Sequence, residues 1–444
     1  MEGLHVKVDT IIKNGKIITA EGEFTGDIAI KDGKIIAIGN LDFGAEEIID
    51  ATDKIIFPGV VDIHVHIYDT DDFYEGTKMC AAGGITTVID LPPTEPQIMD
   101  KESFNKKLQE CNNKSVVDFG LCAGEIYYPK HITNIEQMVK LGASYFKIFM
   151  PGPPPVSDEI MYQAFEEIAK NNSVVAVHAE NSQVLDLLTK RFSAERKDPM
   201  AHPESRPRFL EIESIFKAIQ FAKATGVHLH ICHVTTKEGV ELIRQAKKEK
   251  VNLTAETCPH YLFFTLEDYK KKAPLLKITP PLREKEDNLA LWDAILDGTI
   301  DLITTDHCSF SLAEKLKHKE NIWDVPAGLP GVQFMLSVLF SEWIKKDLPL
   351  SKLAYLLATK PAKTFGLFRK KGSIQVGSDA DLVIIDPREK WTVTKDKLLG
   401  NLGFSQYEGF EIIGKIDTVL LRGKIIYNNE EITAPKGYGE FVHP

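Results

Sequence analysis

Two histidines, His64 and His66, are separated by one residue at the end of an apolar run that begins at Val60. In an extended strand, residues i and i+2 project to the same face, so both imidazoles would face one point. Imidazole suits Zn²⁺, Fe²⁺ or Mn²⁺ as a ligand. The spacing therefore indicates a metal site, provided that other parts of the chain supply further ligands.

Further polar side chains lie at or just after the ends of other β-branched runs: Lys147, His178, His233 and Asp306. A His or Asp inside a packed barrel is costly unless it projects from a strand end. Because the carboxyl ends of parallel strands meet at one face of a barrel, we expect all six side chains to converge on one centre. We expect hydrogen-bonded core or loop positions for the other strand-associated histidines, His228, His230 and His260.

Lys147 is the unusual member of this set, because a protonated lysine would be repelled by a dication. One interpretation is that Lys147 is the partner in a buried ion pair. The other is that CO₂ adds to the neutral amine and forms a carbamate, an anion whose two oxygens can bridge two metal ions. We favour the carbamate because the lysine would face four candidate ligands.

The elements that must position these residues alternate between short apolar strands and amphipathic helices. Helical segments such as 159–169, 211–224 and 237–248 separate the strands. The eight strand candidates are 60–67, 85–91, 116–122, 144–149, 173–179, 227–234, 251–257 and 301–305. This alternation predicts an α/β fold in which helices cover a parallel sheet, and eight units suit a closed (β/α)₈ barrel. The alternative, an open doubly wound sheet, would favour a Gly-x-Gly-x-x-Gly turn, which the sequence lacks.

Both ends of the chain are predicted to form short strands. Residues 10–18 and 26–38 are rich in Ile and Val, and Asn14-Gly15 and Asp32-Gly33 would form hairpin turns. The C-terminal candidates are 380–385, 415–421 and 424–427, with Arg422-Gly423 as a turn. Neither end alone makes a stable sheet, so we expect the ends to pair as one small β-sandwich domain. Two separate extensions are the alternative. The predicted domains are 1–56 and 367–444 for the two parts of the β domain and 57–366 for the barrel.

The bulk composition is that of an ordinary globular protein. The 444 residues are 43% hydrophobic and 26% charged, and the net charge of −11 argues against a nucleic-acid or anionic-membrane partner. No apolar run approaches the roughly 18 residues of a transmembrane helix, and the N-terminus has no signal-peptide pattern. The six cysteines form no Cys-x-x-Cys pair, which is typical of reduced thiols. We therefore expect a cytoplasmic protein with a small-molecule partner.

As an ordered set, the motifs resemble the amidohydrolase superfamily, in the cyclic amidohydrolase branch of hydantoinases, dihydropyrimidinases, allantoinases and dihydroorotases. The resemblance spans nearly the whole chain. The segments that carry it are Val61-Asp-Ile-His-Val-His66, Ala82-Gly-Gly-Ile-Thr-Thr-Val-Ile-Asp90, Phe146-Lys-Ile-Phe149, Val177-His-Ala-Glu-Asn181, His230-Ile-Cys-His-Val-Thr-Thr236, Ala255-Glu-Thr-Cys-Pro-His-Tyr-Leu262, Thr279-Pro-Pro-Leu-Arg283 and Thr305-Asp-His-Cys-Ser-Phe310.

The resemblance implies a TIM-like barrel hydrolase that opens the ring amide of a cyclic ureide (EC 3.5.2 type) with two divalent metal ions, expected to be Zn²⁺. One ion would be held by His64, His66, Lys147 as carbamate and Asp306, and the other by Lys147, His178 and His233. A metal-bridging hydroxide would attack the carbonyl carbon. Asp306 would be the catalytic acid–base group, first accepting a proton and then returning it to the leaving nitrogen. Cys232 would serve in packing, and the protein would form a homodimer or homotetramer.

The motifs do not distinguish cleanly between the substrates of hydantoinases, dihydropyrimidinases and allantoinases. Dihydroorotases resemble one another in an Arg and two Asn residues that hold a carboxylate, where this chain has Tyr68, Pro93 and Thr279. We therefore expect a neutral ring of the hydantoin, dihydropyrimidine or allantoin type. The matched loops contain no arginine except Arg283, which relatives with neutral substrates also carry. The expected substrate contacts are Tyr68, Thr279, Ala327 and Gly328.

Three alternatives remain at this point. Dihydroorotase activity is disfavoured by the three departures above. Some relatives of dihydropyrimidinases are non-catalytic scaffold proteins that have lost the metal ligands, whereas this chain retains all six. Metal-dependent deaminases on the same barrel usually lack the lysine on the fourth strand, and here Lys147 is present.

Overall fold

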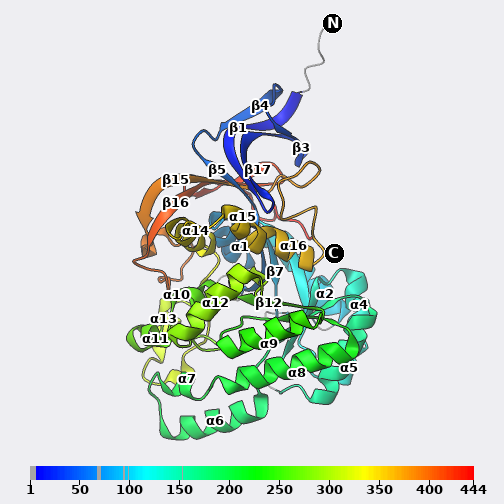
Figure 1. Cartoon of the computed structure of the whole chain (residues 1–444), viewed down its shortest axis with the longest axis vertical. Coiled ribbons are helices and arrows are strands. Elements are labelled where there is room, and N and C mark those ends of the chain that lie inside the picture. The colour runs from blue at the N-terminus through cyan, green and yellow to red at the C-terminus, as the bar shows by residue number, and fades with distance from the viewer. Residues whose placement is uncertain (1–6, 68–71, 94–95, 99, 153) are drawn as a thin grey trace.

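The computed structural model describes residues 7–67, 72–93, 96–98, 100–152 and 154–444. The described strands form two nine-stranded sheets. Figure 1 shows the sheet built from both ends of the chain at the top and the helices that surround the barrel below it. No helix within these ranges is long and apolar enough to cross a membrane.

The first sheet is the predicted barrel, and every pair of neighbouring strands in it is parallel. Its strands are β6 (Val60–His66), β7 (Ile85–Asp90), β8 (Asp118–Gly124), β9 (Tyr145–Phe149), β10 (Val174–His178), β11 (His228–Ile231), β12 (Leu253–Thr257), β13 (Leu302–Ile303) and β14 (His307–Cys308). β13 pairs with β12, and β14 pairs with β6. These two short strands share the eighth position and close the barrel, which confirms the predicted (β/α)₈ architecture.

The barrel strands are buried on both faces, which is why their sequences are nearly continuous apolar runs. Each predicted run overlaps one strand, but the run 301–305 gives only the two residues of β13. The chain leaves the sheet after β13 and passes through Asp306, whose backbone is left-handed with φ of +47°. It rejoins the sheet as β14 one residue later.

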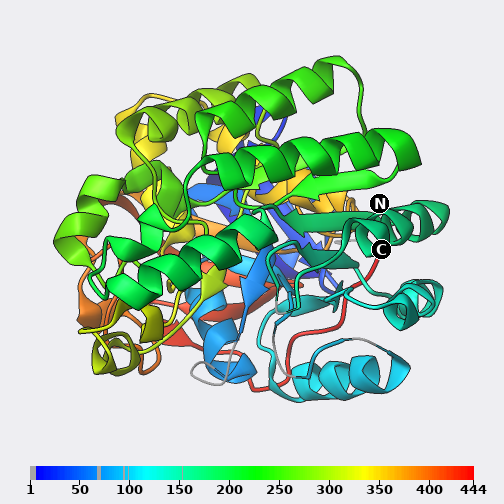
Figure 2. The same cartoon turned by 90° about the horizontal axis from the view of Figure 1, so that it is seen from below.

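Helices follow the barrel strands and cover the outside of the sheet, as Figure 2 shows from below. Their bounds are α1 (Phe73–Ala82), α2 (Lys101–Lys114), α3 (Pro129–Ile132), α4 (Ile135–Leu141), α5 (Asp158–Lys170), α6 (Ser182–Glu195), α7 (Ala201–Glu204), α8 (Phe209–Thr225), α9 (Lys237–Lys248), α10 (Pro259–Phe263), α11 (Leu266–Lys272), α12 (Lys285–Asp297), α13 (Leu312–Lys317), α14 (Met335–Lys345), α15 (Leu350–Ala354) and α16 (Lys360–Thr364).

Helix α9 illustrates how the sequence sets these elements, and its bounds are those predicted. Val240, Ile243 and Ala246 recur at helical spacing and are buried against the barrel. The Thr236 hydroxyl accepts the Gly239 N–H and caps the first turn. Because Thr236 lies three residues after His233, the cap also fixes the end of the loop that carries this histidine.

The second sheet joins both chain ends in the order β18-β17-β16-β15-β5-β1-β2-β3, and β4 pairs with β1. The strands are β1 (Lys7–Thr19), β2 (Gly22–Lys31), β3 (Lys34–Gly39), β4 (Gly44–Asp50), β5 (Ile55–Pro58), β15 (Leu382–Thr392), β16 (Glu411–Leu421), β17 (Lys424–Asn428) and β18 (Glu431–Ile432). β5 lies between N-terminal β1 and C-terminal β15. The ends therefore form one unit, and the alternative of two separate extensions is wrong.

One predicted turn in this sheet is wrong. Asn14-Gly15 lies inside β1, where the register with β2 shifts between Ile12 and Gly15. Asn14 has φ of +64° and donates its backbone N–H to Asp27 Oδ1 at 3.0 Å, so the pair forms a bulge instead of a hairpin. The turns at Asp32-Gly33 and Arg422-Gly423 are confirmed, because each joins two antiparallel strands.

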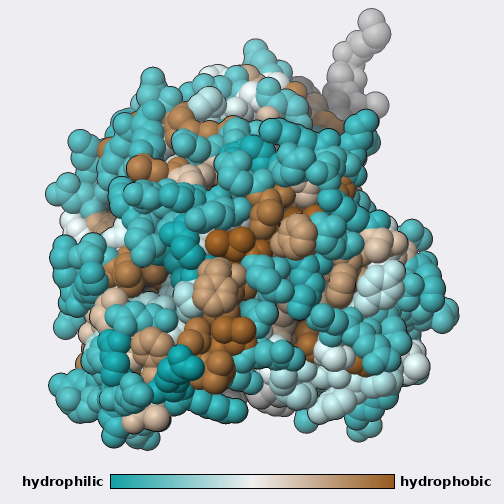
Figure 3. Space-filling view, turned by 60° about the horizontal axis from the view of Figure 1, so that its bottom comes forward, coloured by the Kyte–Doolittle hydropathy of each residue, from teal (hydrophilic) through white to brown (hydrophobic). Residues whose placement is uncertain are grey.

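The surface seen in Figure 3 is mostly hydrophilic, with apolar side chains gathered in a band across its middle. Large apolar residues on the barrel helices contribute to the exposed surface: Phe209 and Phe216 of α8 are 51% and 52% exposed. They are separated by seven residues, so they lie on one face of the helix.

Candidate active site

The structure brings three of the predicted ligands together at the barrel's carboxyl end. The ligand atoms of His64, His66 and Asp306 all lie within 4.8 Å of one another. Asp306 Oδ1 is 3.2 Å from Nε2 of His64 and 3.4 Å from Nε2 of His66. The same side of β6 therefore presents both imidazoles to one carboxylate, as the i, i+2 spacing predicts.

Asp306 is held at the break between β13 and β14 by its neighbour Thr305. The Thr305 hydroxyl donates to Asp62 Oδ2 at 2.6 Å, and the Thr305 N–H donates to Asp62 Oδ1 at 3.3 Å. Asp62 lies on β6, two residues before His64. The Asp62 carboxyl group therefore links the first strand, β6, to the segment between β13 and β14, next to the site.

Lys147 reaches the same centre from β9 and is fully buried. Its Nζ is 3.5 Å from Nε2 of His64 and donates to Sγ of Cys232 at 2.9 Å. Cys232 packs in a buried cluster as expected, and it also contacts the lysine, which the sequence did not predict. The amine therefore lies beside a candidate ligand and a thiol.

His178 and His233 form the other half of the centre. Their ring centroids are 4.6 Å apart, and the His233 ring lies 5.5 Å from that of His64. His178 ends β10, whereas His233 follows the end of β11 by two residues and has φ of +34°. All six predicted side chains thus lie around one end of the barrel.

Burial keeps two histidines of this centre, His64 and His233, neutral. Burial, together with the charge of Lys147, lowers the pKa of His64 to about 4. Burial and the neighbouring His178 hold the pKa of His233 well below its usual value. Neutral imidazole is the form that binds a metal ion, so these groups are ready to act as ligands at neutral pH.

The two other groups of the centre favour their charged forms. Burial opposes ionisation of Asp306, but the adjacent histidines hold its pKa well below the usual range. Burial also disfavours the charged amine of Lys147, but Cys232, Glu256 and Asp306 together raise its pKa. The unmodified lysine is therefore protonated, and it must lose this proton before CO₂ can add.

Glu256 on β12 is a buried residue of the site that sequence reasoning missed, although it lies in a motif quoted above. Its carboxylate contacts Nδ1 of His64, lies 3.0 Å from Nε2 of His230 and accepts the N–H of His233 at 3.3 Å. Despite its burial, His64 and His230 hold the pKa of Glu256 well below the usual range. Because Glu256 occupies Nδ1 of His64, Nε2 faces Asp306 and Lys147.

The other histidines are outside the centre, as predicted. His230 is buried with Nδ1 2.9 Å from Thr254 Oγ1, and Nε2 of His228 lies 3.2 Å from the same hydroxyl. His260 differs from the expectation of a hydrogen-bonded residue. Its Nε2 has no hydrogen-bond partner among the described residues, and its ring packs 4.2 Å from that of Tyr261.

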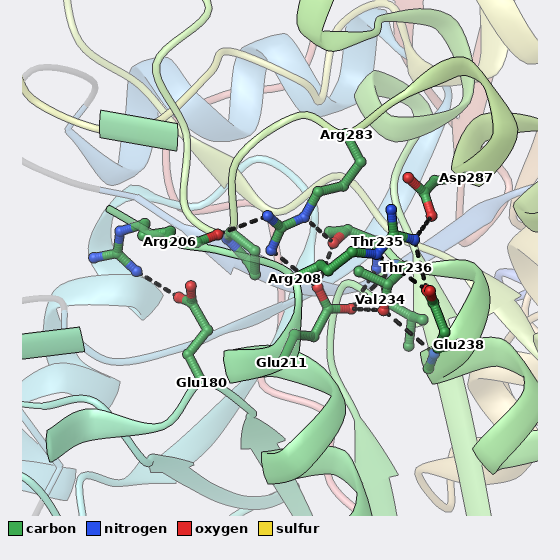
Figure 4. Close-up of polar contacts among 12 residues, drawn as sticks. Glu180, Arg206, Arg208, Glu211, Val234, Thr235, Thr236, Glu238, Arg283 and Asp287 are labelled. Atoms are coloured by element: carbon green, nitrogen blue, oxygen red, sulfur yellow. Dashed lines mark hydrogen bonds and ion pairs between the residues drawn. The ribbon is translucent and has the colours of Figure 1, made fainter. Parts of the chain in front are cut away.

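A polar network beside the centre holds the loops that carry His178 and His233 (Figure 4). Glu180 Oε2 lies 2.7 Å from Nε2 of His178 and accepts from Nη1 of Arg206 at 2.5 Å. Arg283 donates to the Arg206 carbonyl at 2.7 Å and to the Thr235 hydroxyl at 3.1 Å. Arg283 therefore positions the loop after His233 and the segment that contains Arg206.

The centre opens into a cavity of about 260 Å³ that is lined by His66, His178, His233 and Asp306. Of the expected substrate contacts, Thr279, Ala327 and Gly328 line it, and Tyr68 lies outside the described residues. The lining also includes Pro93, Glu125, Tyr127, Phe149, Pro151, Gly152, Arg206, Ile278 and Cys308. Sequence reasoning missed Arg206, because it reaches the cavity from a loop that no matched motif covers.

The wall formed by Ala327 and Gly328 is fixed from behind by two buried lysines. Lys277 Nζ donates to the carbonyls of Ile322 and Val325 at 2.6 and 2.5 Å, and Lys315 Nζ donates to that of Pro326 at 2.9 Å. Burial lowers the pKa of Lys277 to about 8 and that of Lys315 to about 7.

The backbone N–H of Gly328 in this wall is already engaged within the protein. The Gly328 N–H already donates to the Lys277 carbonyl at 3.0 Å. Gly328 therefore shapes the wall and has no N–H left for a substrate.

A tyrosine enters the cavity from the loop after β8. The Tyr127 hydroxyl donates to Glu125 Oε1 at 3.1 Å, and a Cβ on Gly152 would collide with this hydroxyl. The loop after the lysine strand β9 has no tyrosine of its own. Its glycine leaves space for a tyrosine from the neighbouring loop.

Comparison with known proteins places these features in a family. The sequence profile of the amidohydrolase family matches residues 55–426. The chain is 34% identical to the L-hydantoinase of Paenarthrobacter aurescens, over 98% of both chains, and 35% identical to the allantoinase of Enterococcus faecalis, over 98% of this chain and 100% of the relative. The solved structure of L-hydantoinase (dihydropyrimidinase) from Arthrobacter aurescens superposes with a TM-score of 0.94 at 34% identity, covering 98% of this chain and 100% of that one. The chain therefore belongs to the amidohydrolase family, in the branch that contains hydantoinases and allantoinases.

Proposed function

We propose that the chain hydrolyses the ring amide of a cyclic ureide, with a two-metal centre at the carboxyl end of the barrel. The observation that carries this proposal is the cluster of His64, His66 and Asp306, of which His66 and Asp306 line a cavity of about 260 Å³. Relatives named hydantoinase and allantoinase align over almost their full length, which gives the reaction class. The volume suits a small ring better than a polymer.

The residues present fit divalent metal ions. Four imidazoles and one carboxylate are a donor set typical of Zn²⁺ and similar ions. Glu256 orients His64 in the way that carboxylates support ligating histidines in metal sites. The proposed ligands of the first ion are His64, His66, Asp306 and a Lys147 carbamate, and those of the second are His178, His233 and the same carbamate.

The modified lysine is supported by position and charge. Lys147 Nζ lies 3.5 Å from Nε2 of His64, so an unmodified ammonium group would oppose cation binding. Two dications would favour the neutral amine and its anionic carbamate over the protonated amine. Zn²⁺ is the proposed metal because of the histidine-rich ligand set.

When bound, the ions would make an attacking water more acidic and polarise the scissile carbonyl. The part played by the protein is proton transfer at the carboxylate of Asp306. Because its pKa is depressed, this group is ionised at neutral pH and can accept a proton. It can then return the proton to the ring nitrogen as the amide bond breaks.

A carboxylated ring is the second candidate, and Arg206 is the observation that favours it. A buried carboxylate needs a fixed cation, and Arg206 supplies one in the cavity. Glu125 lines the same cavity and would repel the carboxylate. We therefore retain a neutral ring as the proposed substrate.

Ring opening is tested with metal-replete protein on hydantoin, dihydrouracil, allantoin and dihydroorotate. We expect about two transition-metal ions per chain and turnover of one or more of the neutral rings. Protein that binds two ions and opens none of the four rings would contradict the proposed function. Fastest turnover of dihydroorotate would favour the carboxylated ring.

The proposed assembly is a homodimer or homotetramer. Phe209 and Phe216 on α8 are half exposed, and an interface would remove them from water. Sedimentation of the metal-loaded protein measures the number of chains.

A further inference from the structure

Arg206 lies between α7 and α8, and its side chain forms part of the wall of the active-site cavity. The side chain is only 18% exposed. Its partner Glu180 is completely buried and also contacts the proposed ligand His178. The guanidinium group is therefore fixed at a short distance from the metal centre.

Most of the hydrogen-bonding capacity of Arg206 is unused by the protein. A guanidinium group has five N–H donors, and here Nη1 donates to Glu180. Within the part of the chain that the structure describes, Nε and Nη2 donate to no acceptor, and Figure 4 shows both turned away from Arg283. A substrate oxygen can accept from these groups without displacing a contact between protein atoms.

The other groups around the cavity restrict which chemical group of the substrate can carry this oxygen. Lys277 and Lys315 stand behind the wall near Thr279 and Gly328, where both amines donate to backbone carbonyls. Glu125 lines the cavity with Tyr127 donating to it. The cavity therefore presents both a guanidinium donor and a carboxyl group to the substrate.

Three kinds of ring substituent would make different contacts with Arg206 and Glu125 in this wall. A hydrocarbon substituent would remove water from the Arg206 donors and offer no acceptor. A carboxylate would accept from Arg206 but would be repelled by Glu125. A ureido group has a neutral carbonyl that accepts from the guanidinium, and its N–H groups tolerate a nearby carboxyl group.

We propose that Arg206 is a specificity-determining residue that donates to the carbonyl of a ureido substituent, so that the preferred substrate is a five-membered ureide of the 5-ureidohydantoin (allantoin) class. This inference rests on the proposed ring hydrolysis and specifies the substrate of the same site. A lost hydrogen bond to a charged donor corresponds to about a 10- to 100-fold loss in specificity.

The test compares Arg206→Lys with the wild type in metal-replete protein. Lysine keeps the positive charge beside Glu180 but loses the planar fork. Arg208→Lys is the matched control, because Arg208 lies two residues away, pairs with Glu238 and Asp287, and does not line the cavity. The substrates are 5-ureidohydantoin, unsubstituted hydantoin, 5-isopropylhydantoin and hydantoin-5-acetic acid, and kcat/KM and metal content are measured for each protein.

The wild type is expected to prefer 5-ureidohydantoin, and Arg206→Lys is expected to reduce this preference over hydantoin by about 10-fold or more, with metal content unchanged. Arg208→Lys should leave the preference unaltered. Equal losses on all four rings, or a wild-type preference for the isopropyl ring, would overturn the inference. A preference for the acetic acid derivative would assign Arg206 to a carboxylate and also overturn it.

A binding measurement separates this inference from the proposed function. If no ring is opened, the proposed function fails, and calorimetric titration of 5-ureidohydantoin into both proteins still decides the role of Arg206. Weaker binding to Arg206→Lys than to the wild type would support the contact. Equal binding to the two proteins, or no binding to either, would overturn it.

Discussion

The carboxylate of Glu256 contacts Nδ1 of His64, and this contact turns Nε2 of the same ring toward Asp306 and Lys147. Glu256 is on β12 and His64 is on β6, so a residue on one strand sets which atom of the His64 ring faces the proposed metal site. The Glu256 contact therefore sets both the orientation of the His64 ring and which of its two nitrogens carries the proton.

Glu256→Gln should weaken metal binding. The amide keeps the shape of the side chain, but it cannot hold the His64 N–H with a negative charge. We expect metal affinity to fall about 10- to 100-fold, measured by competition with a chelator. Glu238→Gln, at an exposed carboxylate on α9, is the control and should bind metal as the wild type does. Unchanged affinity in Glu256→Gln would show that His64 needs no such support.

Lys147→Ala should lose one or both metal ions and most of the activity, because the bridging carbamate cannot form. Short carboxylic acids added to this variant should restore part of the activity by supplying bridging oxygens. The intact mass of the wild type should be greater than that of its sequence by one CO₂. An unmodified lysine in active protein with two ions per chain would contradict the carbamate.

Asp306→Asn should reduce turnover about 10²- to 10⁴-fold, because the amide cannot accept the proton. The melting temperature of the metal-loaded variant should change little, since the side chain keeps its volume. Near-full activity would assign the proton transfer to another group. Steady-state kinetics and calorimetry on the same preparations provide both measurements.

Metal-free protein should lose stability as the pH falls from 6.5 toward 4. Burial lowers the pKa of His64, His228 and His260 to about 4 from the ordinary value of 6.5. The unfolded chain therefore takes up protons in this window before the folded chain does, which favours unfolding. For fully buried His64 the contribution is about 3 kcal/mol, present above pH 6.5 and lost progressively below it. Urea unfolding at pH 7 and pH 5 measures the effect, and equal midpoints would contradict it.

Gly152→Ala should raise KM more than it lowers the melting temperature. Its Cβ would collide with the Tyr127 hydroxyl and push that ring within the cavity. Adding Tyr127→Phe should restore KM in part, since the colliding oxygen is removed. Gly44→Ala is the control, because a Cβ at Gly44 meets no atom within 4 Å. A variant with unchanged KM would show that this loop does not shape the substrate site.

The sequence was sufficient to predict the convergence of the six ligand-type residues, because strand direction alone puts their ends at one face. It was not sufficient for Glu256, whose contacts depend on how β12 lies against β11 and β6. Arg206 was missed because it lies in a loop between two helices, where no periodicity relates a side chain to the cavity. Asn14-Gly15 was misplaced because a bulge and a hairpin both require the same left-handed backbone.

The break in the last barrel strand would give a metal ion bound at the proposed site a structural role. β13 is attached to β12 and β14 to β6, and Asp306 lies in the gap between them. His64 and His66 come from the first strand, β6. An ion held by these two residues and Asp306 would therefore link the first strand to the last, where the barrel closes. Metal binding would then depend on the first and last strands having come together. Removal of the ions would destabilise the barrel first where these two strands meet.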